Sequence, residues 1–331
     1  MHRYLIFRTD RIGDFIFSRM LIRSIKEANK NNIIDVVCSK YNYNYIKNFS
    51  DINKLYILDK YDFNLLIKNR YLINKNKYDF LVILDSKRRS IFYSIFLKSK
   101  IKIAILKDFR PNLLLKIFFH KYFINSEINS QFVNFLTVGN YLNIKQVRPI
   151  SYYDNYKLAI NKIKYLNKNS ILLHLDEKWF KGYYHKDYTY MNLNSQNFND
   201  LILVIFKKFK KNIILTSGGM DVNELDEIIK NNFFHKERNI YFSNKYENKL
   251  IYVKKTNFRE LESIVQLSSL IICCEGAISH VSNAFSKNTI ALINKKNLNT
   301  ALFWTKHMKN IKLIYRDNLN LINKQIKKVK F

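Results

Sequence analysis

The sequence predicts an α/β protein made of two doubly wound domains, and three observations lead to that prediction. Short apolar runs typical of buried strands alternate with helix-period segments almost from end to end. The alternation occurs twice, with a polar interruption at residues 145–168. A chain of 331 residues that is 47% hydrophobic is long for one domain and sufficient for two cores. We therefore expect an N-terminal domain at 1–160 and a C-terminal domain at 161–331, facing each other across a cleft.

Continuous apolar strands separated by helices are typical of parallel sheets covered on both faces. Ligands of such sheets bind beyond the carboxyl ends of the strands, so the loops that follow the strands are the places to search. The expected strands are Tyr4–Phe7, Ile33–Cys38, Phe80–Leu84, Ile101–Leu106, Ile171–Leu175, Ile213–Thr216, Leu270–Cys274, Thr289–Ile293 and Ile311–Tyr315. The expected helices are Asp14–Ala28, Phe198–Phe209, Asp221–Asn231, Phe258–Leu267 and Ala277–Phe285.

The chain is strongly basic, since 57 Lys and Arg against 26 Asp and Glu leave a formal net charge of +31. Such a field attracts nucleotides, phospholipid headgroups, phosphorylated glycans and nucleic acid. The abundance of Lys, Asn, Ile, Tyr and Phe is also what an AT-rich genome supplies, and that bias explains the charge equally well. The charge alone therefore does not select a ligand.

Cysteine usage and hydropathy predict a cytoplasmic protein, soluble or peripheral on the inner membrane face. Cys38, Cys273 and Cys274 are too few for a disulfide framework and lack zinc-ligand spacing with His280, so we expect buried thiols and no metal site. No secretory signal precedes the first strand. No apolar run approaches the roughly 20 residues that span a bilayer.

The first candidate site is Arg8-Thr9-Asp10-Arg11-Ile12-Gly13-Asp14, the loop between the first strand and its helix. Gly13 allows a tight turn and a close approach to a ligand. The free N–H groups of a helix start favour an anion. Asp14 is either a helix cap, the commoner role on the residues alone, or a general base.

This loop resembles the opening motif of the ADP-heptose:lipopolysaccharide heptosyltransferases, glycosyltransferase family 9. Asn48–Leu55, and Lys77–Asp85 with the following Arg88-Arg89-Ser90, are similar to further segments of that family. The resemblance implies a GT-B architecture of two Rossmann-like domains, with Asp14 as the base that deprotonates the acceptor hydroxyl. On the acceptor side of the cleft it implies Arg8, Asp10, Arg11, Gly13 and Asp85.

The C-terminal half has the features that this resemblance assigns to the donor. Lys178 and Trp179 stand where the family has a diphosphate-binding Lys and a Trp-Pro pair, although Phe180 replaces the Pro. A solvated surface lysine is the alternative for Lys178. The next strand ends in Ser217-Gly218-Gly219. In the family, the acidic helix that follows this turn carries a Glu that binds the ribose. Asp221, Glu224, Asp226 and Glu227 are the candidates here, and we select Glu224.

A third segment, Glu275-Gly276-Ala277-Ile278-Ser279-His280, is similar to the family's Asp-Thr-Gly segment and the His that follows it. A glycine turn before a helix holds phosphate through backbone N–H groups. A lone His in a helix is more often a core residue, whereas His280 follows the glycine turn. Glu275 replaces Asp, and Ala277 lacks the hydroxyl of Thr or Ser, so a sugar other than heptose stays open. The donor-binding candidates are Lys178, Ser217, Gly218, Glu224, Glu275, Gly276, Ala277, Ser279 and His280.

The resemblance covers about the first hundred residues and about 170–295, and it implies a glycosyltransferase that needs neither metal nor cofactor. The implied partners are a nucleotide-sugar donor, such as ADP-heptose, and a lipid-linked or glycan acceptor. Three alternatives stay open: a nucleic-acid-binding protein, suggested by the charge and 48 Phe and Tyr, an epimerase of the same fold, and an inactive family member. Most of the aromatic residues are at core-period positions.

The stretch Asn112–Ile124, with Pro111 in its first turn, predicts a helix that is apolar over most of its surface. A helix over one sheet face needs fewer apolar residues. It is either buried between the sheet and the second domain or touches the inner leaflet, where basic residues add about 1 kcal/mol each near anionic lipid.

Overall fold

The structure is a computed structural model that describes residues 1–59, 61–106, 113–124, 130–145, 147, 169–183, 191–237, 239–243, 245–246 and 249–331. The chain divides into two compact units, described separately below. Unit 1 is Met1–Tyr152 with Leu302–His307, and unit 2 is Tyr153–Ala301 with Met308–Phe331. The predicted interruption at 145–168 and the boundary after residue 160 fall almost wholly outside the described residues.

Unit 1 contains, in its described part, a six-stranded parallel sheet in the order β3-β2-β1-β4-β5-β6. The chain winds outward from β1 in one direction and then returns to its other side, so the strand order reverses between β1 and β4. The strands are β1 (Arg3–Arg8), β2 (Ile33–Cys38), β3 (Lys54–Ile57), β4 (Tyr78–Ile83), β5 (Ser99–Leu106) and β6 (Lys121–Ile124).

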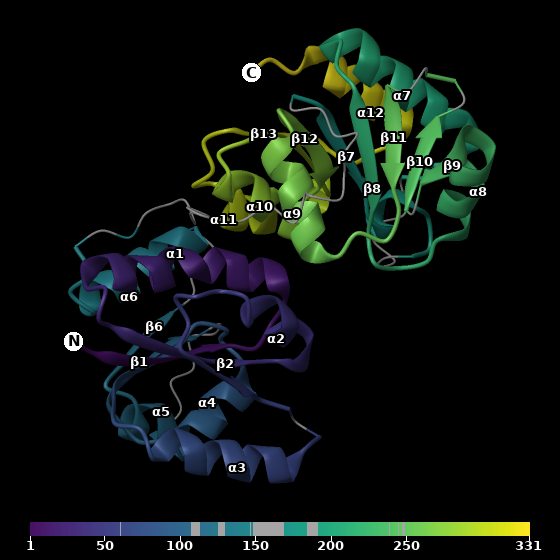
Figure 1. Cartoon of the computed structure of the whole chain (residues 1–331). Helices are drawn as coiled ribbons and strands as arrows, with labels where there is room; N and C mark the ends of the chain where they lie inside the picture. Colours follow the sequence, from purple (N-terminus) through teal and green to yellow (C-terminus); the bar gives the residue numbers. More distant parts are fainter. Residues whose placement is uncertain are drawn as a thin grey trace. The chain divides into compact units, whose positions relative to one another are not determined.

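Helices cover both faces of this sheet (Figure 1). The helices are α1 (Ile12–Ala28), α2 (Lys40–Ile46), α3 (Phe63–Asn74), α4 (Arg88–Ile95), α5 (Leu113–Phe118) and α6 (Gln131–Tyr141). On one face α1 packs against α6 through Phe17 and Phe135, whose ring centroids are 5.2 Å apart. Trp304, from the C-terminal segment of unit 1, packs edge-on against the same Phe17 ring. On the other face α3, α4 and α5 cover a core that includes Leu5, Phe7 and Leu81.

The predicted helix Asn112–Ile124 is wrong in its second half. Helix α5 ends at Phe118, and Lys121–Ile124 forms the edge strand β6, with Tyr122 opposite Ala104 of β5. Leu115 and Phe119 are buried in the core of unit 1. The segment 113–124 is apolar because it contains a short helix and a strand, each of which packs one side on the core. Pro111 and Asn112 lie outside the described residues.

Unit 2 contains an eight-stranded sheet in its described part, in the order β14-β13-β12-β7-β8-β11-β10-β9. The strands from β14 to β11 are parallel, whereas β10 is antiparallel to both β11 and β9, which the sequence did not predict. The strands are β7 (Ile171–Leu175), β8 (Ile213–Ser217), β9 (Phe233–Glu237), β10 (Ile240–Ser243), β11 (Leu250–Val253), β12 (Leu270–Cys274), β13 (Asn288–Ile293) and β14 (Ile311–Tyr315).

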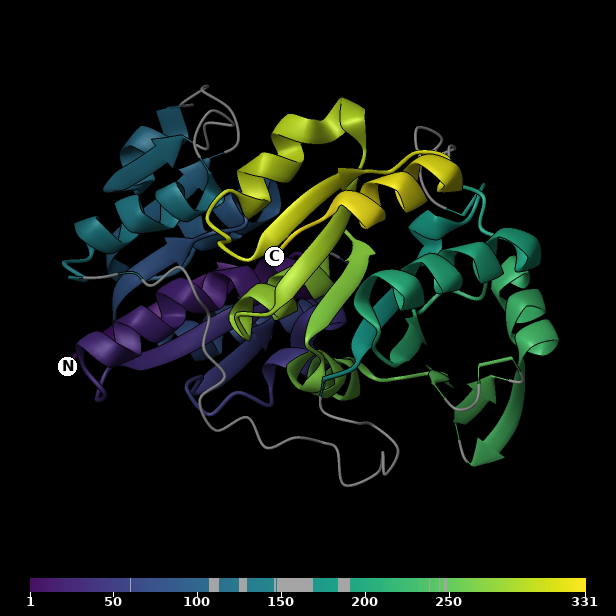
Figure 2. The same ribbon diagram turned by 90° about the horizontal axis from the view of Figure 1, so that it is seen from above.

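The helices of the C-terminal half alternate with these strands, as Figure 2 shows from above. They are the 3-10 helices η2 (Glu177–Trp179) and η3 (Lys295–Asn297), and α7 (Ser195–Phe209), α8 (Asn223–Asn232), α9 (Phe258–Leu267), α10 (Ala277–Ala284), α11 (Leu298–Thr305) and α12 (Leu319–Lys328). Within the described ranges, no helix is long and apolar enough to cross a membrane.

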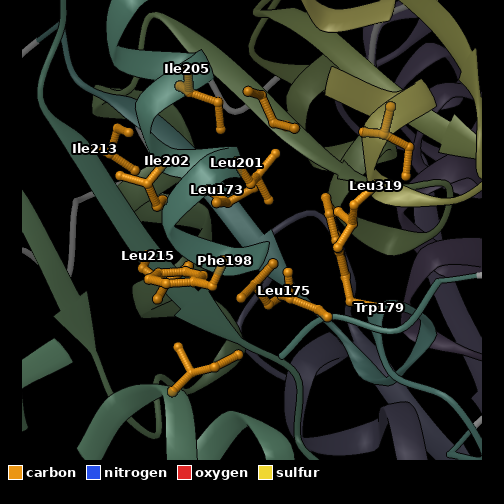
Figure 3. Close-up of a cluster of buried hydrophobic side chains, with 14 of the residues drawn as sticks. Leu173, Leu175, Trp179, Phe198, Leu201, Ile202, Ile205, Ile213, Leu215 and Leu319 are labelled. Atoms are coloured by element: carbon orange, nitrogen blue, oxygen red, sulfur yellow. The ribbon is translucent and has the colours of Figure 1, made fainter. Parts of the chain in front are cut away.

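The core of unit 2 lies between its sheet and helices α7 and α12 (Figure 3). Asn194 caps α7 by accepting hydrogen bonds from two backbone N–H groups, and the helix then buries Phe198, Leu201, Ile202 and Ile205. Each such side chain contributes about 1.5–3 kcal/mol on burial. As expected, the three cysteines of the chain are buried and unpaired. This core fixes the strand ends that carry the site of unit 2.

Candidate functional site

The loops after β1 and β4 are joined at the point where the strand order of unit 1 reverses. The backbone N–H and the hydroxyl of Thr9 donate to Oδ2 of Asp85, over 3.1 and 2.6 Å. The hydroxyl of Ser90 donates to the same oxygen over 2.7 Å. Such a reversal point is where ligands of doubly wound sheets bind. Asp85 therefore links the loops after β1 and β4 that form this candidate site.

Arg8 is a buried cation beneath the loop, with 1% of its surface exposed. Its Nε donates to the backbone oxygen of Asp14 over 3.0 Å, and another guanidinium nitrogen donates to the backbone oxygen of Leu84. The guanidinium also forms ion pairs with the carboxylates of Asp10, at 3.1 Å, and Asp14, at 3.7 Å. One buried charge thus positions both acidic residues of the loop.

Asp14 lies in the first turn of α1, and both of its predicted roles fit its position. Its Oδ2 accepts a hydrogen bond from the backbone N–H of Arg11 over 3.1 Å, so the carboxylate does cap the helix start. Its side chain also keeps 25% of its surface exposed, so an oxygen is accessible to a ligand. Gly13 is buried inside α1 without a positive φ, so the expected glycine turn is not what places Asp14.

Asp10 has the most perturbed carboxyl group of this loop. Burial raises its pKa to about 7, and the neighbouring carboxylates of Asp14 and Asp85 add to the rise, while Arg8 and Lys87 oppose it. Lys87 and Arg89 both donate to the backbone oxygen of Thr9, over 3.2 and 3.0 Å. Neither cation was predicted as a site residue from the sequence, although their place directly after a strand could have indicated them.

The site of unit 2 begins at the ends of β7 and β12, again where the strand order reverses. Nζ of Lys178, after β7, donates to the backbone oxygen of Glu275, after β12, and lies 3.6 Å from the Asp176 carboxylate. Only 13% of the Lys178 side chain is exposed. Lys178 is therefore not a solvated surface lysine.

Gly276 forms the turn between β12 and α10, and its lack of a side chain makes room for Lys178. Its φ is +158°, and a Cβ at this position would lie 3.2 Å from Nζ of Lys178. The hydroxyl of Ser279 donates to the backbone oxygen of Gly276 over 2.7 Å. His280 follows in the first turn of α10, next to Ala277 and Ser279, and is mostly buried. The start of α10 and the Lys178 ammonium supply donors of the kind that bind phosphate, and the Asp176 carboxylate lies 3.6 Å from the ammonium.

The end of β8 adds a third segment beside β7. The N–H of Gly218 donates to the backbone oxygen of Leu175 over 3.0 Å, and a Cβ on Gly218 would lie 3.2 Å from a carboxylate oxygen of Glu177. The Ser217 hydroxyl is hydrogen-bonded to that of Tyr252 at 3.1 Å. Further along, Oε2 of Glu224 is buried and has no hydrogen-bond partner among the described residues.

A cavity of about 40 Å³, large enough for a water molecule, lies beside Lys178 and Glu275. Its wall also contains Arg316 and Asn294, which the sequence analysis did not identify. The neighbouring His174 is hydrogen-bonded to Thr216 at 2.9 Å, and burial lowers its pKa to about 4. His174 is thus a neutral core residue at neutral pH.

Within the described residues, no group of three or more His, Cys, Asp or Glu is placed to hold a metal ion.

No protein-family model and no curated protein matches the sequence. Solved structures do match the fold. Escherichia coli heptosyltransferase WaaC with ADP matches with a TM-score of 0.72 at 11% identity, over 98% of both chains. A glycosyl transferase of family 9 from Veillonella parvula matches with a TM-score of 0.69 at 14% identity, over 100% of this chain and 90% of that one. E. coli ADP-heptose LPS heptosyltransferase II matches with a TM-score of 0.67 at 10% identity, over 98% of both.

The fold is GT-B. The strand alternation predicted two doubly wound Rossmann-like units, and the resemblance to the heptosyltransferases extends to their fold. A UDP-GlcNAc 2-epimerase from Methanocaldococcus jannaschii is a weaker match, with a TM-score of 0.57 at 14% identity, over 100% of this chain and 94% of that one. At identities of 10–14% these structural matches establish the fold alone. An activity depends on the residues of the site.

Proposed function

We propose that this protein is a glycosyltransferase that moves heptose or a related sugar from a nucleotide diphosphate donor to lipopolysaccharide or another surface glycan. The observation that carries the proposal is Asp14, a partly exposed carboxylate oriented by a buried arginine at the reversal point of the sheet. The GT-B fold, shared with heptosyltransferases, supports the same assignment. We propose a cytoplasmic location, with a lipid-linked acceptor at the inner leaflet.

In this proposal unit 2 binds the donor. Lys178 and the N-terminus of α10 neutralise the diphosphate, with His280 one turn further on, so that no metal ion is required. Ser217 and Gly218 approach the nucleoside, and the buried Oε2 of Glu224 accepts a hydrogen bond from a ribose hydroxyl. The remaining contacts come from Glu275, Gly276, Ala277 and Ser279.

Unit 1 supplies the base. An acceptor hydroxyl oxygen attacks the anomeric carbon while the bond from that carbon to the diphosphate oxygen breaks. Asp14 takes the hydroxyl proton, and the nucleoside diphosphate leaves with its added negative charge close to Lys178. Arg8 pairs with the Asp14 carboxylate and orients it, and Asp85 holds the loop through Thr9.

The test is Asp14→Asn, which keeps the size of the side chain and removes the base. Transfer should fall by about 100-fold or more, the usual scale for a general base, while calorimetry finds donor binding unchanged. Glu27→Gln is the matched control, because Glu27 is a carboxylate near the end of the same helix that pairs with Arg23. Near-normal turnover of Asp14→Asn would leave Asp14 as a helix cap only.

Two other functions give different results in the same assays. An epimerase, the function named for the M. jannaschii match, would change the sugar of the donor with no acceptor present. A nucleic-acid-binding protein would bind random DNA in a salt-dependent way and show no affinity for nucleotide sugars.

A further inference from the structure

Helix α3 exposes a row of large apolar side chains to solvent. Phe63, Ile67 and Tyr71 are 72%, 52% and 61% exposed. Their spacing of four residues places them on one side of the helix, while Asn69 and Ile73 are buried on the other. An amphipathic surface helix normally has the opposite arrangement, with its apolar side chains toward the core.

The neighbouring helices continue this surface. Phe92 of α4 is 62% exposed and its ring contacts that of Phe96, which is stacked under the guanidinium of Arg70 from α3 at 5.3 Å. On α5, Ile117 is 64% exposed. We call this surface the outer apolar face; its members are Phe63, Ile67, Tyr71, Phe92, Phe96, Ile117 and Phe118. All three helices cover the same side of the sheet (Figure 1).

The charges around the outer apolar face are mainly positive. The stretches 63–78 and 86–106, which contain α3, α4 and β5, include no Asp or Glu. They include seven exposed basic residues, Lys68, Arg70, Lys75, Lys77, Arg88, Lys98 and Lys100. The acidic residues beside them are Asp62, which caps the start of α3, and Asp79, which pairs with Lys100. Lys75 lies over the Tyr71 ring at 4.2 Å. Exposed aromatic and aliphatic side chains surrounded by cations are typical of proteins that lie on an anionic membrane.

We propose that the outer apolar face docks on an anionic lipid bilayer, with its aromatic and isoleucine side chains at headgroup depth and its cations on the lipid phosphates. Charge complementarity selects this partner, since a second copy of a chain with a net charge of +31 would bring like charges together. Nucleic acid would match the charge, but Ile67 and Ile117 have no ring on which a base could stack.

This inference rests on the proposed function at one point, because a lipid-linked acceptor explains why the transferase would meet a membrane. The described contacts link the two features directly. Helix α4 begins at Arg88, and the next two residues, Arg89 and Ser90, are hydrogen-bonded to Thr9 and Asp85 of the site in unit 1. Docking of α4 would therefore bring the Asp14 loop near the lipid surface.

The first experiment is flotation of the full chain with vesicles of phosphatidylcholine alone and of equal parts phosphatidylcholine and phosphatidylglycerol. The wild type should float with the anionic vesicles at low salt. Phe63→Ser/Phe92→Ser should reduce the bound fraction by about tenfold or more, and Lys68→Glu/Arg88→Glu should abolish the preference for anionic lipid. Val133→Ser/Tyr141→Ser is the matched control, since both residues are exposed on α6, on the opposite side of the sheet.

A second measurement does not require the removal of apolar side chains from the outer apolar face. Tryptophan emission from Tyr71→Trp should shift to the blue when anionic vesicles are added, while that from Tyr141→Trp should not. Failure of the wild type to float, an equal loss in the α6 control, or no emission shift from Tyr71→Trp would overturn the inference, as would binding of DNA but not vesicles. Donor binding and transfer to a soluble acceptor, both measured without vesicles, test the proposed function independently.

Discussion

Nε of the buried Arg8 lies 3.1 Å from Oδ1 of Asp10, and the same guanidinium reaches the Asp14 carboxylate at 3.7 Å. Two carboxylates therefore share one buried cation. Asp10 is the more buried of the two, with 16% of its side chain exposed against 25% for Asp14. This arrangement leaves Asp14 accessible for chemistry and makes Asp10 the group whose charge depends on pH near neutrality.

Asp10 should make the protein less stable as the pH rises towards neutrality. Its pKa is about 7 in the folded chain, against about 3.9 in an unfolded one, so the folded state binds the proton more tightly. Stability should therefore fall as the pH increases from about 4 to 7, and the full penalty is present above that window. Asp10→Asn should raise the melting temperature at pH 8 by several degrees and change it little at pH 4.

Asp59→Asn is the control for this measurement. The pKa of Asp59 is lowered, mainly by a hydrogen bond from Lys40. Asp59→Asn should not show the rise in melting temperature at pH 8 that is expected of Asp10→Asn. A melting temperature of Asp10→Asn that follows the wild type at both pH values would mean that Asp10 is ionised throughout.

Lys178→Ala and His280→Ala should weaken binding of a nucleoside diphosphate more than binding of the nucleoside. The Lys178 ammonium lies at the Gly276 turn, where the diphosphate is proposed to bind. Calorimetry should find a loss of about tenfold or more for the diphosphate. Lys181→Ala, at an exposed lysine nearby, is the control. Equal losses of affinity for both ligands would mean that Lys178 does not bind the phosphates.

Gly276→Ala should impair diphosphate binding through a steric effect. The added methyl group would lie 3.2 Å from Nζ of Lys178, and the φ of +158° is unfavourable for alanine. Gly219→Ala tests the same change where a Cβ would meet no atom within 4 Å. Thermal shift with ADP and UDP should separate the two variants, and indistinguishable shifts would argue against the Gly276 turn as the phosphate site.

Trp179 should matter to unit 2 as a core residue. It is fully buried against the cluster in Figure 3, and its Nε1 has no hydrogen-bond partner in the described part of the chain. Trp179→Ala should cost about 3–5 kcal/mol. Trp179→Phe should cost less than half as much, because it keeps a ring and removes an unsatisfied N–H. Urea unfolding measures both, and equal costs would mean that the indole N–H is bonded.

Local sequence was sufficient for most of the parallel strands. Ile33–Cys38, Ile171–Leu175, Leu270–Cys274 and Ile311–Tyr315 begin and end where the apolar runs predict. A strand covered by helices on both faces is apolar at most positions, as Ile171–Leu175 and Leu270–Cys274 are, so its pattern is strong and its bounds are clear. The strands β9 and β10, at the antiparallel edge, are short and partly exposed, and their weaker pattern was missed.

Local sequence was not sufficient for Tyr122 and Phe123, which were predicted in a helix and lie in β6. Nor did it show that Phe63, Ile67 and Tyr71, at core-like spacing, face solvent. In both cases the apolar pattern states that a side chain can be buried, and the neighbouring elements decide whether it is. Pairing with β5 and the position of α3 are properties of the assembled sheet.

The sequence by itself determined the two doubly wound units and the loops that carry Asp14, Lys178 and His280, because strands, glycine turns and helix starts are encoded over a few adjacent residues. Only the tertiary structure decided what surrounds these groups. Three of these features depend on residues that follow different strands of a sheet. They are the raised pKa of Asp10, the burial of Lys178 against Glu275, and the hydrogen bonds between Thr9 and Asp85. Desolvation and Coulomb interactions depend on distances through space, and separation along the chain does not fix those distances.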